Sequence, residues 1–177
     1  MVIQGQGLVG SGCLQAAKAQ GVERVIVVDS LPLRCELALS LGADEVIEAS
    51  AVDPIARVLE LTDGQGADVV VEAVGGRAGA TAFAQAQDML KRGGLLQVLG
   101  LYEEEPLPLY SDKIMGKRLV GSYLDASQRA EGAARTLQLL ASGQIQFDKM
   151  ITHRFASTEA AEAFDLLYKR MGETMAV

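Results

Sequence analysis

The sequence predicts an α/β protein in which a doubly wound, six-stranded parallel sheet is the middle of three α/β/α layers. Along residues 1–145, apolar runs of strand length alternate with segments of helical period. The runs at 26–28 and 69–71 contain no polar residue, which is typical of strands that helices cover on both faces. Glycine accounts for 19 of 177 residues and aromatic residues for only 5%. This composition suits tight strand-to-helix turns and aliphatic packing.

Each predicted strand is a short apolar run bounded by turn residues. These strands cover residues 1–4, 24–29, 45–48, 69–72, 95–99 and 118–123. Each predicted helix repeats its apolar residues at a helical period. These helices cover residues 8–20, 31–41, 54–62, 79–90 and 131–142, and Gly143 closes the last of them. Segment 102–108 holds three consecutive glutamates and two prolines, so we expect a surface loop there.

The residues after 145 follow a different pattern. Residues 150–155 alternate between apolar and polar, which predicts a strand. Ser157 opens a helix that runs to about residue 170, and residues 174–177 are a terminal strand stub. The sequence therefore predicts one α/β domain over 1–145 and a strand-helix-strand extension over 146–177.

Charge and cysteine content exclude several classes of function. The chain has 16 Lys and Arg against 23 Asp and Glu, a net charge of −7, so no nucleic acid and no anionic membrane surface is an expected partner. No apolar run reaches the length of a membrane span or of a signal-peptide core. Cys13 and Cys35 lie 22 residues apart, in no metal-binding or redox spacing. We therefore expect a reduced, cytoplasmic protein.

A glycine motif stands between the first predicted strand and the first predicted helix. Gly5, Gly7 and Gly10 form the pattern G-x-G-x-x-G, which in this position indicates a Rossmann-type dinucleotide site. Gly5 permits the sharp turn, Gly7 lets the backbone approach a pyrophosphate, and Gly10 lets the helix pack closely on the strand. The free N–H groups of that helix then face the phosphates. The alternative is a glycine-rich turn without a ligand.

Asp29 strengthens the dinucleotide interpretation. It ends the second strand 19 residues after Gly10, where an acid is needed to accept hydrogen bonds from the adenosine ribose. A carboxylate there also repels a 2′-phosphate, which favours NAD over NADP. The alternative is an acidic N-cap for the helix that begins after Ser30. Arg34 is consistent either with a place along the adenosine or with an exposed helix position.

At this point the sequence resembles a known family, at landmarks that follow one another in order. Residues 2–10, 25–29 and 41–44 resemble the nucleotide-binding, C-terminal half of medium-chain, zinc alcohol dehydrogenase-like dehydrogenases. Further landmarks of the same family cover residues 66–75, 93–100, 151–155 and 162–164. The resemblance implies an NAD-binding domain over 1–145 and a return segment of the catalytic domain over 146–177. The implied reaction of the parent enzyme is hydride transfer between an alcohol or polyol and NAD.

The resemblance also implies which residues contact the cofactor. It places the pyrophosphate beside Gly7, Leu8 and Val9. It places the adenosine ribose beside Asp29 and Arg34. The cleft on the nicotinamide side is lined by residues that follow the fourth and fifth strands, namely Ala73, Val74, Leu99, Gly100 and Leu101. Core packing is an equally good interpretation for the four of these that are not glycine.

The catalytic half of that family, with its substrate pocket and zinc ligands, precedes the segment that this chain resembles. The chain has two cysteines and one histidine, too few for the structural and catalytic zinc sites that the resemblance implies. We therefore predict no catalytic residue and no metal site here, with zinc only in the absent half and no turnover by this chain alone. Cys13 is predicted to be a small buried hydrophobic residue. His153 is predicted to face a partner or cap an element rather than take part in chemistry.

Other classes of function make different demands on the sequence. A non-catalytic nicotinamide-sensing module, in which NADH shifts an oligomer equilibrium, would carry an output segment, whereas residues 144–177 resemble the dehydrogenase return. Methyl transfer from S-adenosylmethionine would by resemblance want an acid near Ile3, which the sequence does not supply. In the family's strand order, the strand from Arg118 to Tyr123 lies at the sheet edge. Pairing of that edge with its copy predicts a homodimer.

Overall fold

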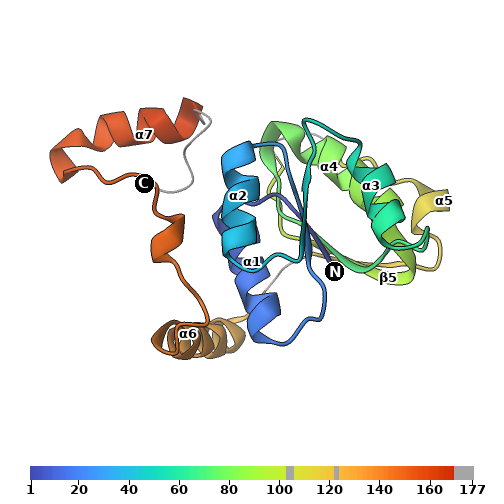
Figure 1. The fold of residues 1–177 in the computed structure, drawn as a ribbon, viewed down its shortest axis with the longest axis horizontal. Coiled ribbons are helices and arrows are strands. Elements are labelled where there is room, and N and C mark those ends of the chain that lie inside the picture. Colours follow the sequence, from blue (N-terminus) through green and yellow to red (C-terminus); the bar gives the residue numbers. More distant parts are fainter. Residues whose placement is uncertain (103–105, 122–123, 170–177) are drawn as a thin grey trace.

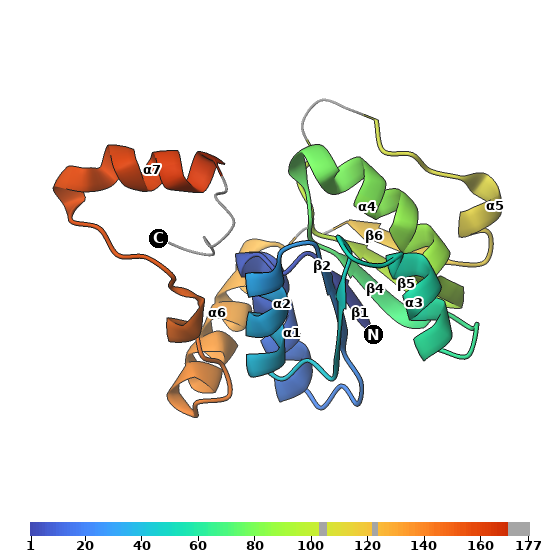
Figure 2. The same ribbon diagram turned by 45° about the horizontal axis from the view of Figure 1, so that its top comes forward.

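A computed structural model describes residues 1–102, 106–121 and 124–169 of the chain. Its sheet has six parallel strands in the order β3-β2-β1-β4-β5-β6 (Figures 1 and 2). The strands are β1 (Val2–Gln4), β2 (Ile26–Asp29), β3 (Glu45–Glu48), β4 (Ala67–Glu72), β5 (Leu90–Val98) and β6 (Arg118–Gly121). The direction of winding reverses between β1 and β4. The doubly wound Rossmann-type fold is therefore confirmed.

Helices cover both faces of this sheet, because neighbouring apolar residues of each strand point to opposite faces. The helices are α1 (Leu8–Ala19), α2 (Pro32–Ser40), α3 (Pro54–Leu61), α4 (Gly76–Met89), α5 (Ser111–Ile114), α6 (Ala126–Ala141) and α7 (Ala160–Lys169). Val2 belongs to a core shared with α3 and α4. Ile3 belongs to a second core shared with α1 and α2. Figure 1 shows these two pairs of helices on opposite sides of the sheet, which confirms the three layers.

Two helices begin at aspartate caps, and one of these caps corrects a predicted boundary. Asp53 accepts hydrogen bonds from the amides of Ile55 (2.9 Å) and Ala56 (3.4 Å) at the start of α3. Asp125 accepts from Gln128 N (2.9 Å), and the Gln128 side chain accepts from Asp125 N (3.0 Å). This capping box starts α6 at residue 126 rather than at the predicted residue 131.

Tertiary pairing moves two further boundaries. Strand β5 begins at Leu90 rather than at residue 95, because Leu90 pairs with Ala67 across a register shift in β4. Helix α4 correspondingly begins and ends earlier than predicted, at 76–89. The short helix α5 was not predicted. Of the predicted loop 102–108, residues 102 and 106–108 have no regular structure, and residues 103–105 lie outside the described residues.

The predicted strand at 150–155 is wrong. A 3₁₀ turn at Asp148–Met150 is followed by six residues without helix or strand. Ile151 has extended dihedral angles (φ −85°, ψ 103°), but an extended segment becomes a strand only by hydrogen bonding to a neighbour, and no described strand lies beside it. A second 3₁₀ turn at Ser157–Glu159 then leads into α7. Residue 170 and the predicted strand 174–177 lie outside the described residues.

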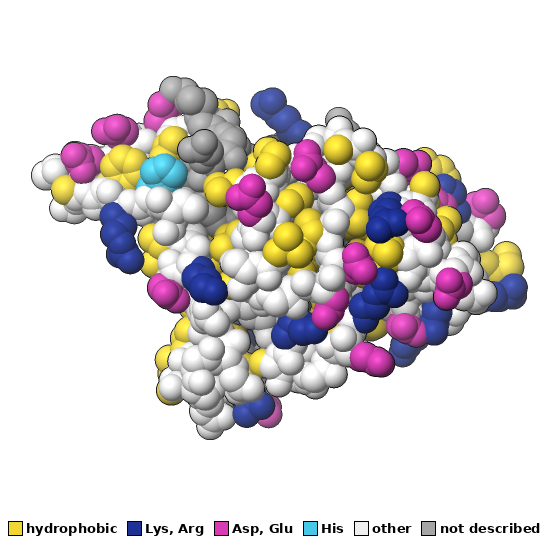
Figure 3. Space-filling model, viewed as in Figure 1, with side chains coloured by type: hydrophobic (Ala, Val, Ile, Leu, Met, Phe, Trp, Pro, Cys, Tyr) yellow, Lys and Arg dark blue, Asp and Glu magenta, His cyan; other side chains and the backbone are white. Residues whose placement is uncertain are grey.

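The C-terminal segment is held to the domain by few contacts. Gln15 on α1 accepts from Gln146 N (2.6 Å) and donates to the Met150 sulfur (3.4 Å). Lys149 Nζ also donates to Ser40 O on α2 (3.3 Å), and the Met150 side chain packs in the core shared with α1 and α2. Helix α7, in contrast, lies apart from the sheet in both ribbon views. Its side chains Phe164 and Tyr168 are 72% and 86% exposed. Figure 3 shows hydrophobic side chains at the surface of this segment, beside the single histidine.

Candidate functional site

The three motif glycines fill distinct structural roles. Gly5 has φ +84°, and a Cβ there would lie 2.9 Å from the Ala73 carbonyl oxygen. A Cβ on Gly10 would lie 2.8 Å from the Gly5 carbonyl carbon and closer still to its oxygen. The sharp turn at Gly5 and the close packing at Gly10 are therefore as predicted. A Cβ on Gly7 would meet only Arg34 Nη1, at 4.0 Å, so the backbone is open at this position.

The amino end of α1 presents unsatisfied backbone donors. Gly7 is its N-cap residue, and no described side chain caps the helix or places an acid in its first turn. The first helical hydrogen bond runs from Ser11 N to Gly7 O (2.9 Å), so the amides of Leu8, Val9 and Gly10 precede the helical ladder. The side chains of Leu8 and Val9 are half exposed. These amides and the helix dipole suit a diphosphate.

Asp29 lies at the end of β2 with its carboxylate turned toward the glycine loop. Its Oδ2 accepts from Gln6 N (2.7 Å) and its Oδ1 accepts from Leu31 N (2.9 Å). Leu31 is the N-cap residue of α2, which has no side-chain cap, so Asp29 closes the turn before the helix instead of capping it. Each carboxylate oxygen accepts one amide and retains a second acceptor site. The carboxylate is 6% exposed.

Arg34 reaches the same opening from α2. Its Nη1 lies 3.9 Å from Asp29 Oδ2, and the side chain is 19% exposed. Its Nε is buried and has no hydrogen-bond partner among the described residues. A buried guanidinium donor without a partner is costly unless a ligand supplies an acceptor. The open face of Gly7, the uncapped amides of α1 and this donor together fit a nucleotide with a diphosphate.

The residues predicted for the other side of the cleft follow the carboxyl ends of β4 and β5. Val74 lies against Gly5, since its Cγ2 would be 3.0 Å from a Cβ there. Ala73 N donates to Gln4 O (2.9 Å), and Gly100 N donates to Glu72 O (3.1 Å). The side chain of Leu101 is 87% exposed, whereas Leu99 packs on the core shared with α1 and α2. The topology therefore brings this group to the edge of the sheet that also carries the glycine loop.

A buried polar cluster stabilises the carboxyl ends of β4 and β5. The sequence did not predict it. Glu72 is fully buried, and its Oε1 accepts from Val74 N (2.8 Å) and Gly75 N (3.3 Å). Its Oε2 accepts from the hydroxyl of Tyr102. Burial, together with the adjacent Glu72 carboxyl group, raises the pKa of Tyr102, so the hydroxyl stays protonated and donates. The only sequence signal was a charged residue at the end of an apolar strand.

Cys35 lies beside the candidate site, where its Sγ donates to the Asp29 carbonyl oxygen (3.6 Å), whereas Cys13 on α1 is only partly buried, not fully buried as predicted. Burial raises the pKa of the Cys13 thiol. Burial and the nearby carboxylates of Asp29 and Glu48 raise the pKa of Cys35 to about 11, so both thiols are poor nucleophiles. His153 stacks on Phe155 with ring centroids 6.5 Å apart. Within residues 1–102, 106–121 and 124–169, no group of three His, Cys, Asp or Glu side chains is placed to hold a metal ion.

Comparisons with known proteins show the family of this chain. Residues 9–141 match the family described as zinc-binding dehydrogenase. The chain belongs to this family. Among curated relatives, L-threonine 3-dehydrogenase of Bacillus licheniformis is 34% identical over 169 residues, which are 96% of this chain and 48% of the relative.

Two solved structures share the fold of this chain. Benzyl alcohol dehydrogenase from Acinetobacter calcoaceticus superposes with a TM-score of 0.87 at 27% identity, over 98% of this chain and 47% of the other. An alcohol dehydrogenase from Thermus sp. ATN1 gives a TM-score of 0.84 at 30% identity, over 98% and 49%. This zinc-binding dehydrogenase chain thus spans about half the length of the relatives it matches. No helix in its described part combines the length and apolar character needed to cross a bilayer.

Proposed function

We propose that residues 1–145 form the NAD(H)-binding domain of a dehydrogenase that acts on an alcohol or polyol. Residues 146–177 would belong to the catalytic half, which supplies the substrate pocket and the zinc. This chain alone would bind the cofactor without turnover. Two unpaired thiols support a reduced, cytoplasmic setting.

The observation that carries this proposal is the junction of Gly7, Asp29 and Arg34. The amides of α1 bind the diphosphate, and Asp29 accepts from the ribose hydroxyls with the acceptor sites that Gln6 N and Leu31 N leave free. Arg34 Nε gains an acceptor from the adenosine side. The nicotinamide side is lined by Ala73, Val74, Leu99, Gly100 and Leu101. When bound, the nicotinamide ring supplies the hydride acceptor or donor.

We expect Asp29→Asn to weaken NADH binding by about tenfold, since hydrogen bonds to a charged acceptor contribute about 1.5–3 kcal/mol each. The amide oxygen of asparagine still accepts from one backbone amide, so the loop keeps part of its structure. NADH fluorescence titration measures both affinities. NADPH should bind the unchanged protein more weakly than NADH, and this preference should shrink in the variant.

Asp148→Asn is the matched control, because it removes the same charge from an exposed 3₁₀ turn far along the chain. Its NADH affinity should be unchanged. Equal losses in both variants would mean that net charge, not the Asp29 contact, governs binding. Tighter binding of NADPH than of NADH would contradict the role given to Asp29.

We also propose a homodimer through β6. All four described residues of this edge strand are exposed, with Leu119 at 46% and Val120 at 45%, and an exposed edge offers unpaired backbone groups to a copy of itself. Light scattering should give twice the chain mass, and Leu119→Lys should shift the population to monomer. Leu137→Lys on exposed α6 is the control. A monomer at tens of micromolar for the unchanged protein would contradict this assembly.

A further inference from the structure

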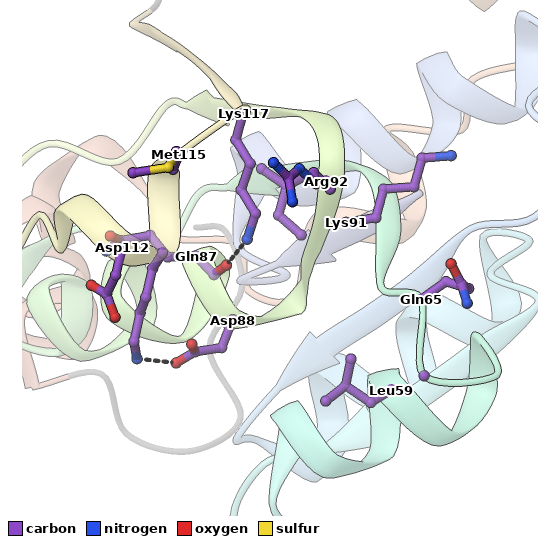
Figure 4. A pocket seen from close by; sticks show the side chains of 12 residues that line it. Leu59, Gln65, Gln87, Asp88, Lys91, Arg92, Asp112, Met115 and Lys117 are labelled. Atoms are coloured by element: carbon purple, nitrogen blue, oxygen red, sulfur yellow. Dashed lines mark hydrogen bonds and ion pairs between the residues drawn. The ribbon is translucent and has the colours of Figure 1, made fainter.

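A concavity lies at the opposite end of the sheet from the proposed nucleotide site. It has a volume of about 380 Å³ and is lined by the residues before β4 and at the start of β5, by the end of α4, and by α5 with the turn after it (Figure 4). The proposed nucleotide site follows the carboxyl ends of the same parallel strands. The two sites are therefore on opposite edges and do not share residues.

The pocket is basic in a chain whose net charge is −7. Four cationic side chains line it (Lys91, Arg92, Lys113 and Lys117), against two acids (Asp88 and Asp112). Lys113 is paired with Asp88 at 2.6 Å, and Lys91 is paired with Asp68, which lies outside the lining. Among the described residues, neither Arg92 nor Lys117 has a carboxylate partner. An anion in this pocket would therefore meet two cationic side chains that no described ion pair holds.

Backbone and side-chain contacts hold these two cations at the same wall. Gly93 N donates to Gly116 O (2.8 Å), which ties the start of β5 to the turn before Lys117. Arg92 Nε lies 3.5 Å from where a Cβ on Gly116 would be. Lys117 Nζ donates to the carbonyl of Gln87 (2.6 Å), as Figure 4 shows. The lysine is thus fixed by a neutral acceptor, and the nearby Asp88 carboxylate, which raises the pKa of Lys117, is itself paired with Lys113.

The Gln87 side chain fixes the surroundings in turn. Its Nε2 donates to Pro108 O (2.7 Å) and its Oε1 accepts from Tyr110 N (3.0 Å), so α4 is joined to the segment that leads into α5. Burial lowers the pKa of Lys117, which an anion beside the ammonium group would offset. The Lys117 side of the site is therefore formed before any ligand arrives, whereas Arg92 is exposed.

We propose that this pocket binds a small phosphate monoester, with Arg92 and Lys117 holding the phosphate group. The guanidinium fork of arginine suits two phosphate oxygens, and the lysine ammonium acts as a point charge. Leu59 and Met115 offer apolar contacts for the body of the ligand. A volume near the lower end of the usual range of about 300–1,000 Å³ suits a metabolite-sized ligand rather than a dinucleotide.

The test is a ¹H–¹⁵N NMR titration of the full chain with inorganic phosphate and with glycerol 3-phosphate at constant ionic strength. We expect saturable shifts at Gly93, Gly116 and the Arg92 Nε–H group. Arg92→Gln should weaken binding by about tenfold, as expected for loss of a charge-assisted contact. Arg129→Gln, which removes an exposed arginine from α6, should leave the affinity unchanged.

Two further variants and a comparison of the two ligands test whether the phosphate binds in this pocket. Lys117→Gln should weaken phosphate binding in the same direction as Arg92→Gln, and Asp29→Asn should not affect it, which separates this pocket from the nucleotide site. Tighter binding of glycerol 3-phosphate than of inorganic phosphate would support a role for Leu59 and Met115 in contacting the ester. Shifts that chloride reproduces, or an unchanged affinity in Arg92→Gln, would overturn the proposal.

Discussion

Replacing Gly10 with alanine is expected to destabilise the domain by about 3 kcal/mol or more, at or beyond the upper end of the cost of overpacking a core. The added Cβ would approach the carbonyl group of Gly5, at 2.8 Å from its carbon. Both groups are backbone, so no side chain can turn away to relieve the clash. Helix α1 would have to move off β1, which also displaces the amides that we assign to the diphosphate. Urea unfolding followed by circular dichroism measures the loss.

Gly12→Ala on the same helix is the matched control. A Cβ there would meet no atom within 4 Å, and alanine is favoured over glycine in a helix interior by about 0.5–1 kcal/mol. The control should therefore be as stable as the unchanged protein or slightly more stable. If the two variants unfolded at the same urea concentration, the close approach of α1 to Gly5 would be wrong.

The sheet could be predicted because its determinants are local in the sequence. An unbroken apolar run such as 69–71 is typical of a strand that is buried on both faces. The positive φ of Gly5 and the close contact at Gly10 leave a sequence signature, since only glycine fits both positions. The fold class and the position of the glycine loop could therefore be predicted from the sequence alone.

The ends of strands that depend on pairing with residues far along the chain could not be predicted in this way. The early start of β5 follows from the pairing of Leu90 with Ala67 and from a shift of register that no local pattern marks. The segment 150–155 has the alternation of a strand, but a strand also needs a neighbour, and none of the described strands provides it. The early start of α6 was readable in principle, because Asp125 and Gln128 have the spacing of a capping box.

The candidate site likewise combines residues that the local sequence predicts with contacts that only the structure shows. Asp29 was predicted from its distance to Gly10, but its bonds to Gln6 N and Leu31 N required the structure. The basic pocket combines α4, β5 and α5, and the last of these was not predicted at all. Residues that meet only through the tertiary fold carry no common signal along the chain.

The second large effect is expected at Glu72, whose carboxyl group is the shared acceptor for three donors. Glu72→Leu would leave Val74 N, Gly75 N and the Tyr102 hydroxyl without it. An unsatisfied donor costs about 1–3 kcal/mol when it is buried. Because the Gly75 bond is buried and the other two are part-buried, we expect a loss of about 3 kcal/mol in the free energy of unfolding. The turn between β4 and α4 would lose these hydrogen bonds, so NADH binding should weaken as well.

Glu72→Gln separates the hydrogen bonds from the charge. Its amide oxygen can still accept from Val74 N and Gly75 N, and its amide group can donate to the Tyr102 oxygen. We therefore expect this variant to lose less than half as much stability as Glu72→Leu. Tyr102→Phe removes one donor and keeps the ring, whose edge-to-face contact with Phe83 has centroids 6.2 Å apart. A Glu72→Gln variant as unstable as Glu72→Leu would show that charge, not the shared acceptor, holds this edge of the sheet together.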